Sequence, residues 1–326
     1  MVRSTLCWLA LLLAAFIVAG CGDDGEDATD STPPPTTTAA SQSPTAGAYP
    51  VTITRSDGVT HTIEARPERV VSLSPGGTEI VFTIGAGEAL IAVDNNADYP
   101  PEVADVPNRV DAYEPNIEAI AGLDPDLVIV ATDSGGVVAA LDRLGIPLLY
   151  QDLDTTVETI DDVIAMIELY GDVFDQRDEA RALAADMRQR VEAVEAAVAD
   201  VAADRPLRVY HELDSTFYTV AEQTFIGSVY ALLALDNIAG DGGGIAYPQL
   251  TQEAIIAADP DVIVLADEEF GVTIDSVKAR PGWDAIAAVQ NDRIYSVDPD
   301  IISRPGPRIV DALEQLASQV YPEQFG

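Results

Sequence analysis

The sequence is poor in positive charge and in side chains that bind metal ions. Its 326 residues contain 17 Lys and Arg against 55 Asp and Glu, a formal net charge of −38 at pH 7. Nucleic-acid backbones need a basic surface, and anionic lipid headgroups would repel this chain, so neither is an expected partner. The only histidines are His61 and His211, and the only cysteines are Cys7 and Cys21. A zinc site with several His or Cys ligands is therefore disfavoured, and we expect no resident metal or cofactor.

The first 20 residues have the pattern of a secretory signal: Arg3, then an apolar run over residues 6–19. The run ends in Val-Ala-Gly before Cys21. Small residues before a Cys resemble the lipobox of bacterial lipoproteins, and this implies that Cys21 becomes the lipidated first residue. The alternative is an ordinary signal peptide followed by an incidental Cys. The lipoprotein interpretation predicts an extracytoplasmic protein, on the cell surface or in the periplasm, held to the membrane by its lipid anchor alone.

Residues 21–48 lack an apolar period. Acidic residues come first, followed by Pro33-Pro34-Pro35 and a stretch of Thr, Ser and Ala. Such a composition cannot bury a core, so we expect a disordered tether here.

A repeat divides the remaining chain into two halves. Glu-Ala-Ile, then Asp-Pro-Asp, then an apolar run occupies residues 118–131 and recurs at residues 253–266. Each copy predicts a short helix, a turn and a strand that is apolar on both faces, as in a covered parallel sheet.

Strand and helix patterns alternate through both halves, which is typical of α/β folds. Further strands are expected at residues 70–74, 90–93, 147–150, 207–211 and 294–297. Helices are expected at residues 78–84, 135–144, 225–235, 283–289 and 307–318. A hairpin is expected at residues 51–54 and 60–63, around Asp57-Gly58.

Residues 176–203 contain no Gly or Pro and carry one apolar stripe at helical spacing. A helix of this length spans roughly 40 Å. We interpret it as a rigid strut between two lobes; the alternative is a surface helix of one lobe. The stripe consists of Leu183, Met187, Val191, Val194, Val198 and Val201.

The predicted fold is thus two Rossmann-like α/β lobes with mainly parallel sheets, joined by one long α-helix. The expected boundaries are residues 49–174 for the N-terminal lobe, 175–204 for the linking helix and 205–326 for the C-terminal lobe. Ligands of open α/β sheets bind beyond the carboxyl ends of the strands, so the cleft between the lobes is the expected site.

Sequence motifs of catalysis are missing. The Gly242-Gly243-Gly244 run lacks the Lys-Ser/Thr of a phosphate loop, and neither a dinucleotide fingerprint nor a nucleophile elbow occurs. We expect His211 to be a hydrogen-bonded structural residue and Trp283 to serve packing. These observations favour a surface-held binding protein over an enzyme.

Four short motifs carry a family resemblance. They are Arg69-Val70-Val71-Ser72-Leu73-Ser74-Pro75 with Thr78-Glu79, Asp98-Tyr99-Pro100-Pro101, Asn116-Ile117-Glu118-Ala119-Ile120, and Arg304-Pro305-Gly306-Pro307-Arg308. Together they resemble the substrate-binding proteins of ABC importers for ferric siderophores and cobalamin, in the class whose lobes are joined by one long helix. The resemblance implies a monomer that captures a metal complex and delivers it to a permease with its ATPase.

The resemblance also implies roles for two glutamates. In this family each lobe docks on the permease through one surface Glu, and the matching residues are Glu118 and Glu253. The alternative is that each acid only complements the dipole of a short helix, worth about 0.3–1 kcal/mol.

The cobalamin-binding members of this family line their cleft with aromatics and a late Asp/Arg pair. By local alignment the matching residues are Tyr113, Tyr218, Tyr247, Asp300 and Arg304, and Asn96 stands where those members have an aromatic residue. A Tyr offers a flat face and a hydroxyl, and an Arg offers a planar set of donors to phosphate or carboxylate. The alternatives are half-buried core tyrosines and an ordinary Asp300–Arg304 ion pair.

The sequence does not determine which metal complex is bound. A trianionic ferric catecholate would approach so acidic a protein against its field, so a neutral or cationic complex such as a hydroxamate, or a near-neutral corrinoid, fits better. Two other classes of function remain: a chelatase-like enzyme on the same scaffold, and a non-transport surface module for sensing or adhesion.

Overall fold

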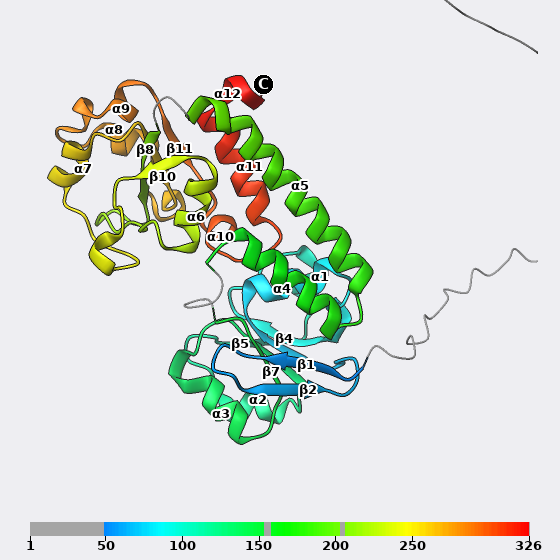
Figure 1. The fold of residues 1–326 in the computed structure, drawn as a ribbon. Helices are drawn as coiled ribbons and strands as arrows, with labels where there is room; N and C mark the ends of the chain where they lie inside the picture. Colours follow the sequence, from blue (N-terminus) through cyan, green and yellow to red (C-terminus); the bar gives the residue numbers. More distant parts are fainter. Residues whose placement is uncertain (1–48, 153–157, 203–205, 326) are drawn as a thin grey trace, which may run out of the picture. The chain divides into compact units, whose positions relative to one another are not determined.

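The structure, a computed structural model, describes residues 49–152, 158–202 and 206–325 (Figure 1). These residues belong to one compact unit, Thr45–Gly326. The predicted signal, Cys21 and the tether of residues 21–48 lie outside the described residues. Within the described part of the chain, no helix is both long enough and apolar enough to cross a bilayer.

The N-terminal half forms a five-stranded parallel sheet in the order β5-β4-β3-β6-β7. Every residue of β3 and β6 is buried, as expected for strands covered on both faces. A separate antiparallel hairpin pairs β1 with β2. The strands are β1 Val51–Thr54, β2 Thr60–Ile63, β3 Val70–Leu73, β4 Leu90–Asp94, β5 Asn108–Val110, β6 Leu127–Val130 and β7 Leu148–Tyr150.

The C-terminal half forms a four-stranded parallel sheet in the order β11-β10-β8-β9. Two parallel sheets alternating with helices confirm the predicted two-lobed α/β fold. The strands are β8 Leu207–Glu212, β9 Leu235–Asn237, β10 Val262–Leu265 and β11 Ile294–Ser296.

The helices lie between these strands and after the last one (Figure 1). The α-helices are α1 Pro75–Thr83, α2 Ile117–Gly122, α3 Val137–Arg143, α4 Ile160–Val173, α5 Arg177–Ala202, α6 Phe225–Leu232, α7 Gln252–Ala258, α8 Ile274–Lys278, α9 Ala287–Gln290, α10 Pro299–Ile302, α11 Ile309–Val320 and α12 Pro322–Phe325. Short 3-10 helices are η1 Gly87–Ala89, η2 Pro101–Asp105, η3 Ser134–Gly136, η4 Gly242–Gly244, η5 Glu268–Phe270 and η6 Trp283–Ala285.

Several local predictions were wrong. Strand β5 and helix α4 were not predicted, although α4 buries one apolar face. Helix α6 ends three residues before Leu235, because Ala234 adopts a left-handed conformation (φ 51°) and Leu235 opens β9. The helix expected at residues 283–289 is broken into η6 and α9 at Ile286, whose backbone is extended.

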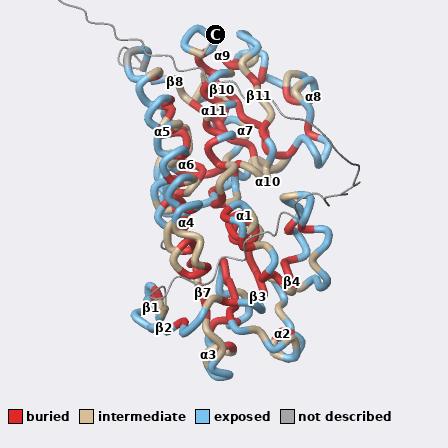
Figure 2. The backbone as a smooth tube through the Cα atoms, turned by 90° about the vertical axis from the view of Figure 1, so that its right-hand side faces the viewer, coloured by how far each residue is buried: buried red, intermediate tan, exposed pale blue. Residues whose placement is uncertain are grey.

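One hydrophobic core runs through both lobes. It joins the faces of the two sheets that are covered by α1, α4, α5, α6 and α11, and two smaller cores fill the opposite faces. Figure 2 shows buried positions along α1, α11 and the strands of both sheets. The lobes are therefore not separate globules.

Helix α5 has 26 residues, about 39 Å at the rise of an α-helix. It lies between the last strand of the first sheet and the first strand of the second, and it packs against α4 and α11. The predicted stripe is buried from Met187 to Val198, but Val201 is exposed because the core ends before it. The role of α5 as a rigid strut stays a prediction.

The sequence repeat has a structural reason. Asp124 and Asp259 end α2 and α7 in left-handed conformations (φ 51° and 45°). Two residues later, Asp126 accepts the backbone N–H of Arg69, and Asp261 accepts that of Arg208. Each Asp-Pro-Asp turn thus ties one helix to the start of the neighbouring central strand.

Candidate functional site

A pocket of about 660 Å³ lies at the carboxyl ends of strands from both sheets. The first lobe contributes residues that follow β3, β4 and β6, and the second contributes residues that follow β10 and β11. This is where open α/β sheets bind ligands. The lining residues are Leu73, Ser74, Pro75, Gly76, Asp94, Asn95, Asn96, Asp98, Ala112, Tyr113, Ala131, Thr132, Ser134, Glu269, Phe270, Asp300, Ser303, Arg304 and Pro305.

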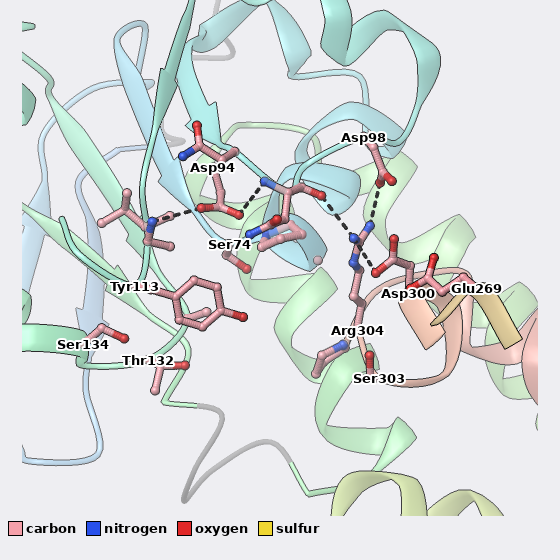
Figure 3. A pocket seen from close by; sticks show the side chains of 18 of the residues that line it. Ser74, Asp94, Asp98, Tyr113, Thr132, Ser134, Glu269, Asp300, Ser303 and Arg304 are labelled. Atoms are coloured by element: carbon pink, nitrogen blue, oxygen red, sulfur yellow. Dashed lines mark hydrogen bonds and ion pairs between the residues drawn. The ribbon is translucent and has the colours of Figure 1, made fainter. Parts of the chain in front are cut away.

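Buried polar side chains hold the walls that come from the first lobe. Ser74 caps α1 by accepting the N–H of Gly77 at 2.9 Å. The buried carboxylate of Asp94 accepts the backbone N–H groups of Asn96 at 2.9 Å and Ala112 at 3.0 Å (Figure 3). Asp94 therefore braces two loops of the pocket wall.

Arg304 joins the two lobes across the pocket. Its guanidinium contacts Asp98 Oδ1 and Asp300 Oδ1, each at 2.6 Å, and donates to the backbone oxygen of Asn96 at 3.1 Å (Figure 3). Only 12% of its side chain is exposed. The ion pair with Asp300, one of the alternatives drawn from the sequence, is present, and contact of Arg304 with a ligand stays a prediction.

The two acids that pair with Arg304 differ in their titration. Burial raises the pKa of Asp300, and the charges of Asp98 and Glu269 raise it further against the effect of Arg304. Burial is the largest effect on Asp98 and opposes its ionisation, but the hydrogen bond to Arg304 and the charges of Arg304 and Arg308 together hold its pKa below the usual value. At Asp300, in contrast to Asp98, the adjacent guanidinium does not outweigh the effect of burial.

Beside the pocket, a second arginine links the two lobes. We call this contact, formed by Gly76, Glu79, Tyr99, Pro305 and Arg308, the joint. Arg308 donates to both carboxylate oxygens of the buried Glu79, at 3.0 and 2.5 Å, and its guanidinium lies 4.1 Å from the centre of the Tyr99 ring. The backbones of Gly76 and Pro305 meet here, since a Cβ on Gly76 would lie 2.6 Å from the Pro305 oxygen. Three of the four family motifs thus converge on one joint.

Exposed aromatic rings face the pocket from both lobes. Tyr113 and Phe270 are 76% and 77% exposed, and both line it. Tyr113 was predicted from the sequence, and its ring projects into the pocket (Figure 3). Phe270 and Glu269 also line the pocket but were not among the predicted residues. Their position directly after a predicted central strand could have indicated them.

The structure brings together four of the six predicted ligand residues: Asn96, Tyr113, Asp300 and Arg304. Tyr218 and Tyr247 do not line this pocket. They are 41% and 53% exposed and lie in the C-terminal lobe. There the backbone of Tyr218 forms an isolated antiparallel β-bridge with that of Gln249. Contact of either tyrosine with a ligand stays a prediction.

Glu118 and Glu253 occupy equivalent places. Each is the second residue of its helix, α2 or α7, and each is exposed. Both helices cover the sheet faces opposite α5, and neither glutamate forms an ion pair within the described residues. The two carboxylates are therefore available to a partner.

Other polar groups noted in the sequence are structural. His211 is fully buried, its Nδ1 lies 2.6 Å from the Tyr230 hydroxyl, and burial lowers its pKa to about 3. Trp283 is also fully buried and stacks under the guanidinium of Arg280. Both structural predictions are confirmed. The described residues contain no cluster of three or more His, Cys, Asp or Glu that could hold a metal ion.

Comparison with known proteins agrees with this architecture. The periplasmic binding protein family model matches residues 70–301. An uncharacterized ABC transporter substrate-binding lipoprotein of Bacillus subtilis (strain 168), YvrC, is 34% identical over 98% of this chain and 97% of its own length. The vitamin B12-binding protein of Vibrio cholerae is 30% identical over 80% of this chain and 92% of its own length. The crystal structure of an ABC-type Fe3+-hydroxamate transport system from Saccharomonospora viridis has a TM-score of 0.69 at 27% identity, and the match covers 84% of this chain and 99% of that one.

Proposed function

Because this chain belongs to the periplasmic binding protein family, we propose that it captures a ferric siderophore or cobalamin and delivers it to an ABC permease. The observation that carries the proposal is the pocket, which strand ends of both sheets form together. Its volume of about 660 Å³ falls within the range of about 300–1,000 Å³ that is usual for small-molecule sites. The relative from Vibrio cholerae is a vitamin B12-binding protein, and the similar structure from Saccharomonospora viridis belongs to an Fe3+-hydroxamate transport system, which supports these two ligand classes.

The proposed attachment is a lipid on Cys21. Support comes from the lipobox-like Val-Ala-Gly-Cys sequence and from the Bacillus relative, a lipoprotein whose alignment covers 98% of this chain. A lipid anchor would hold the pocket outside the cytoplasm, next to a permease in the same membrane.

Ligand binding is tested by titrating the full-length chain in detergent with cyanocobalamin and with several ferric siderophores. Isothermal calorimetry should give a dissociation constant below about 10 μM for at least one of them, near −7 kcal/mol. Failure of every ligand to bind at that level would contradict the proposal.

Docking is tested by charge reversal at Glu118 and Glu253. We expect the double Glu→Lys variant to bind its ligand with unchanged affinity and to lose uptake in cells that carry the cognate permease. Both side chains are exposed and outside the pocket lining, so folding and binding should tolerate the change. Glu323→Lys on α12 is the matched control for each single reversal, since it makes the same charge change at another exposed glutamate. Normal uptake by the double variant would refute the docking role.

A further inference from the structure

The charge of the pocket narrows the class of ligand that it accepts. Four acids and one base line it: Asp94, Asp98, Glu269, Asp300 and Arg304. Asp94 is buried and accepts two backbone N–H groups, so it serves the loops rather than the opening. The three other carboxylates face a single guanidinium, so acidic groups outnumber basic ones at the opening.

The guanidinium is already engaged by the protein. Arg304 contacts Asp98 and Asp300 at 2.6 Å on either side, and 12% of its side chain is exposed. An anionic ligand group would have to displace one of these carboxylates and then lie beside it. Oxyanions, haem propionates and catecholates are therefore poor ligands for this pocket.

The carboxylates of Asp98, Asp300 and Glu269, in contrast, can still accept hydrogen bonds from a ligand. Asp98 and Asp300 each contact Arg304 through their Oδ1 atom, and 63% of the Asp98 side chain and 44% of the Asp300 side chain are exposed. Glu269 is exposed and has no ion-pair partner among the described residues. Figure 3 shows Glu269 beside Asp300 at the edge of the pocket.

Aromatic rings complete the pattern. Tyr113 from one lobe and Phe270 from the other stand exposed on the same pocket, and Phe270 is the direct neighbour of Glu269. Exposed rings bury the apolar body of an organic ligand, and their faces attract cations. Carboxylates next to aromatic faces are the surroundings that an alkylammonium group prefers.

We propose that the pocket selects a metal complex with a protonated amine, namely a ferric trihydroxamate with an alkylammonium arm. The ammonium lies between Glu269 and Asp300, and the chelate packs against Tyr113 and Phe270. This inference rests on the proposed function, because it names the ligand class of the same site.

The test compares two ligands that differ by one charge. Ferrioxamine B carries a free ammonium group, and its N-acetyl derivative holds iron in the same chelate without that charge. Calorimetry on the full-length chain should show binding of the acetylated form weakened about tenfold, the effect of one charge-assisted contact at a partly exposed site. Added salt should reduce the difference.

Two variants locate the effect. Glu269→Gln should bring the ratio of the two affinities closer to one, because only Asp300 then faces the ammonium, while Glu268→Gln should leave the ratio unchanged. Glu268 is the matched control because it is exposed on the same turn of η5 and does not line the pocket.

The outcomes separate this inference from the proposed function. Equal affinity for the two ferrioxamines would overturn the ammonium site and leave the receptor intact. Binding of cyanocobalamin alone would also overturn it, again with the receptor function retained. No binding of any metal complex would refute the proposed function itself.

Discussion

Asp267, directly after β10, lies in surroundings that should make the stability of the protein depend on pH. Its side chain is fully buried, and neither carboxyl oxygen has a hydrogen-bond donor within the described residues. The neighbouring Glu212 is also fully buried and is held by Arg280 through contacts of 2.6 and 2.5 Å. A carboxyl group without donors beside a carboxylate keeps its proton, and burial together with the charge of Glu212 raises the pKa of Asp267 to about 7.

Proton binding to the folded and unfolded states determines the direction in which the stability changes with pH. In the unfolded chain Asp267 loses its proton near pH 3.8, whereas in the folded protein it keeps the proton to about pH 7. Its contribution to stability is therefore fully present below pH 3.8 and is lost as the pH rises through 7. The difference of about three pKa units corresponds to up to about 4 kcal/mol in the free energy of unfolding.

The perturbation is Asp267→Asn, which keeps the shape and removes the titration. We expect its free energy of unfolding, measured by urea denaturation, to exceed that of the parent increasingly from pH 4 to 7 and then to level off. Comparing the two proteins at each pH cancels other titrating groups, such as His211. Asp292→Asn is the control, because that carboxylate is on the surface and pairs with Lys278. A difference between variant and parent that does not grow with pH would refute the reasoning.

Further predictions concern the joint, the pocket wall and the anchor. Gly76→Ala should cost about 1–3 kcal/mol in thermal or urea unfolding, because its Cβ would meet the Pro305 oxygen at 2.6 Å. Gly122→Ala at the end of α2 meets no atom within 4 Å and should be neutral or stabilising by up to about 1 kcal/mol. Phe270→Ala should weaken ligand binding in calorimetry without changing the melting temperature, since the ring is 77% exposed. Labelling with radioactive palmitate should depend on Cys21, and equal labelling of a Cys21→Ala variant would contradict the lipid anchor.

Local sequence patterns predicted the elements that depend on short-range chemistry. The strands at residues 127–131 and 262–266 are apolar without interruption, and both became central strands with every residue buried. The repeated Asp-Pro-Asp turn predicted a repeated helix–strand unit, and the hydrogen bonds of Asp126 and Asp261 explain why those acids recur. The three-residue strand β5 was missed because two of its residues, Asn108 and Arg109, are exposed and polar.

The candidate site was predictable only in part. Tyr113, Asp300 and Arg304 were expected from the family resemblance and line the pocket, as does Asn96. Phe270 and Glu269 were not expected, because nothing local separates an exposed Phe in a pocket from one elsewhere on a surface. Their role depends on residues of the opposite lobe, such as Tyr113, that are far away in the chain.

The sequence by itself determined the class of the protein: an acidic chain with a signal-like start, a repeated α/β unit and no catalytic motif. These properties follow from composition and from contacts between near neighbours. Only the tertiary structure decided how Arg304 is used, because Asp98 reaches it from 206 residues away and Asp300 from the adjacent turn. The tertiary structure also decided the sign of the pocket's charge, because Asp98 and Asp300 neutralise the charge of Arg304, which then no longer attracts an anion. The physical reason is that charge pairing depends on distance in space, and spacing along the chain does not encode that distance across the joint between two lobes.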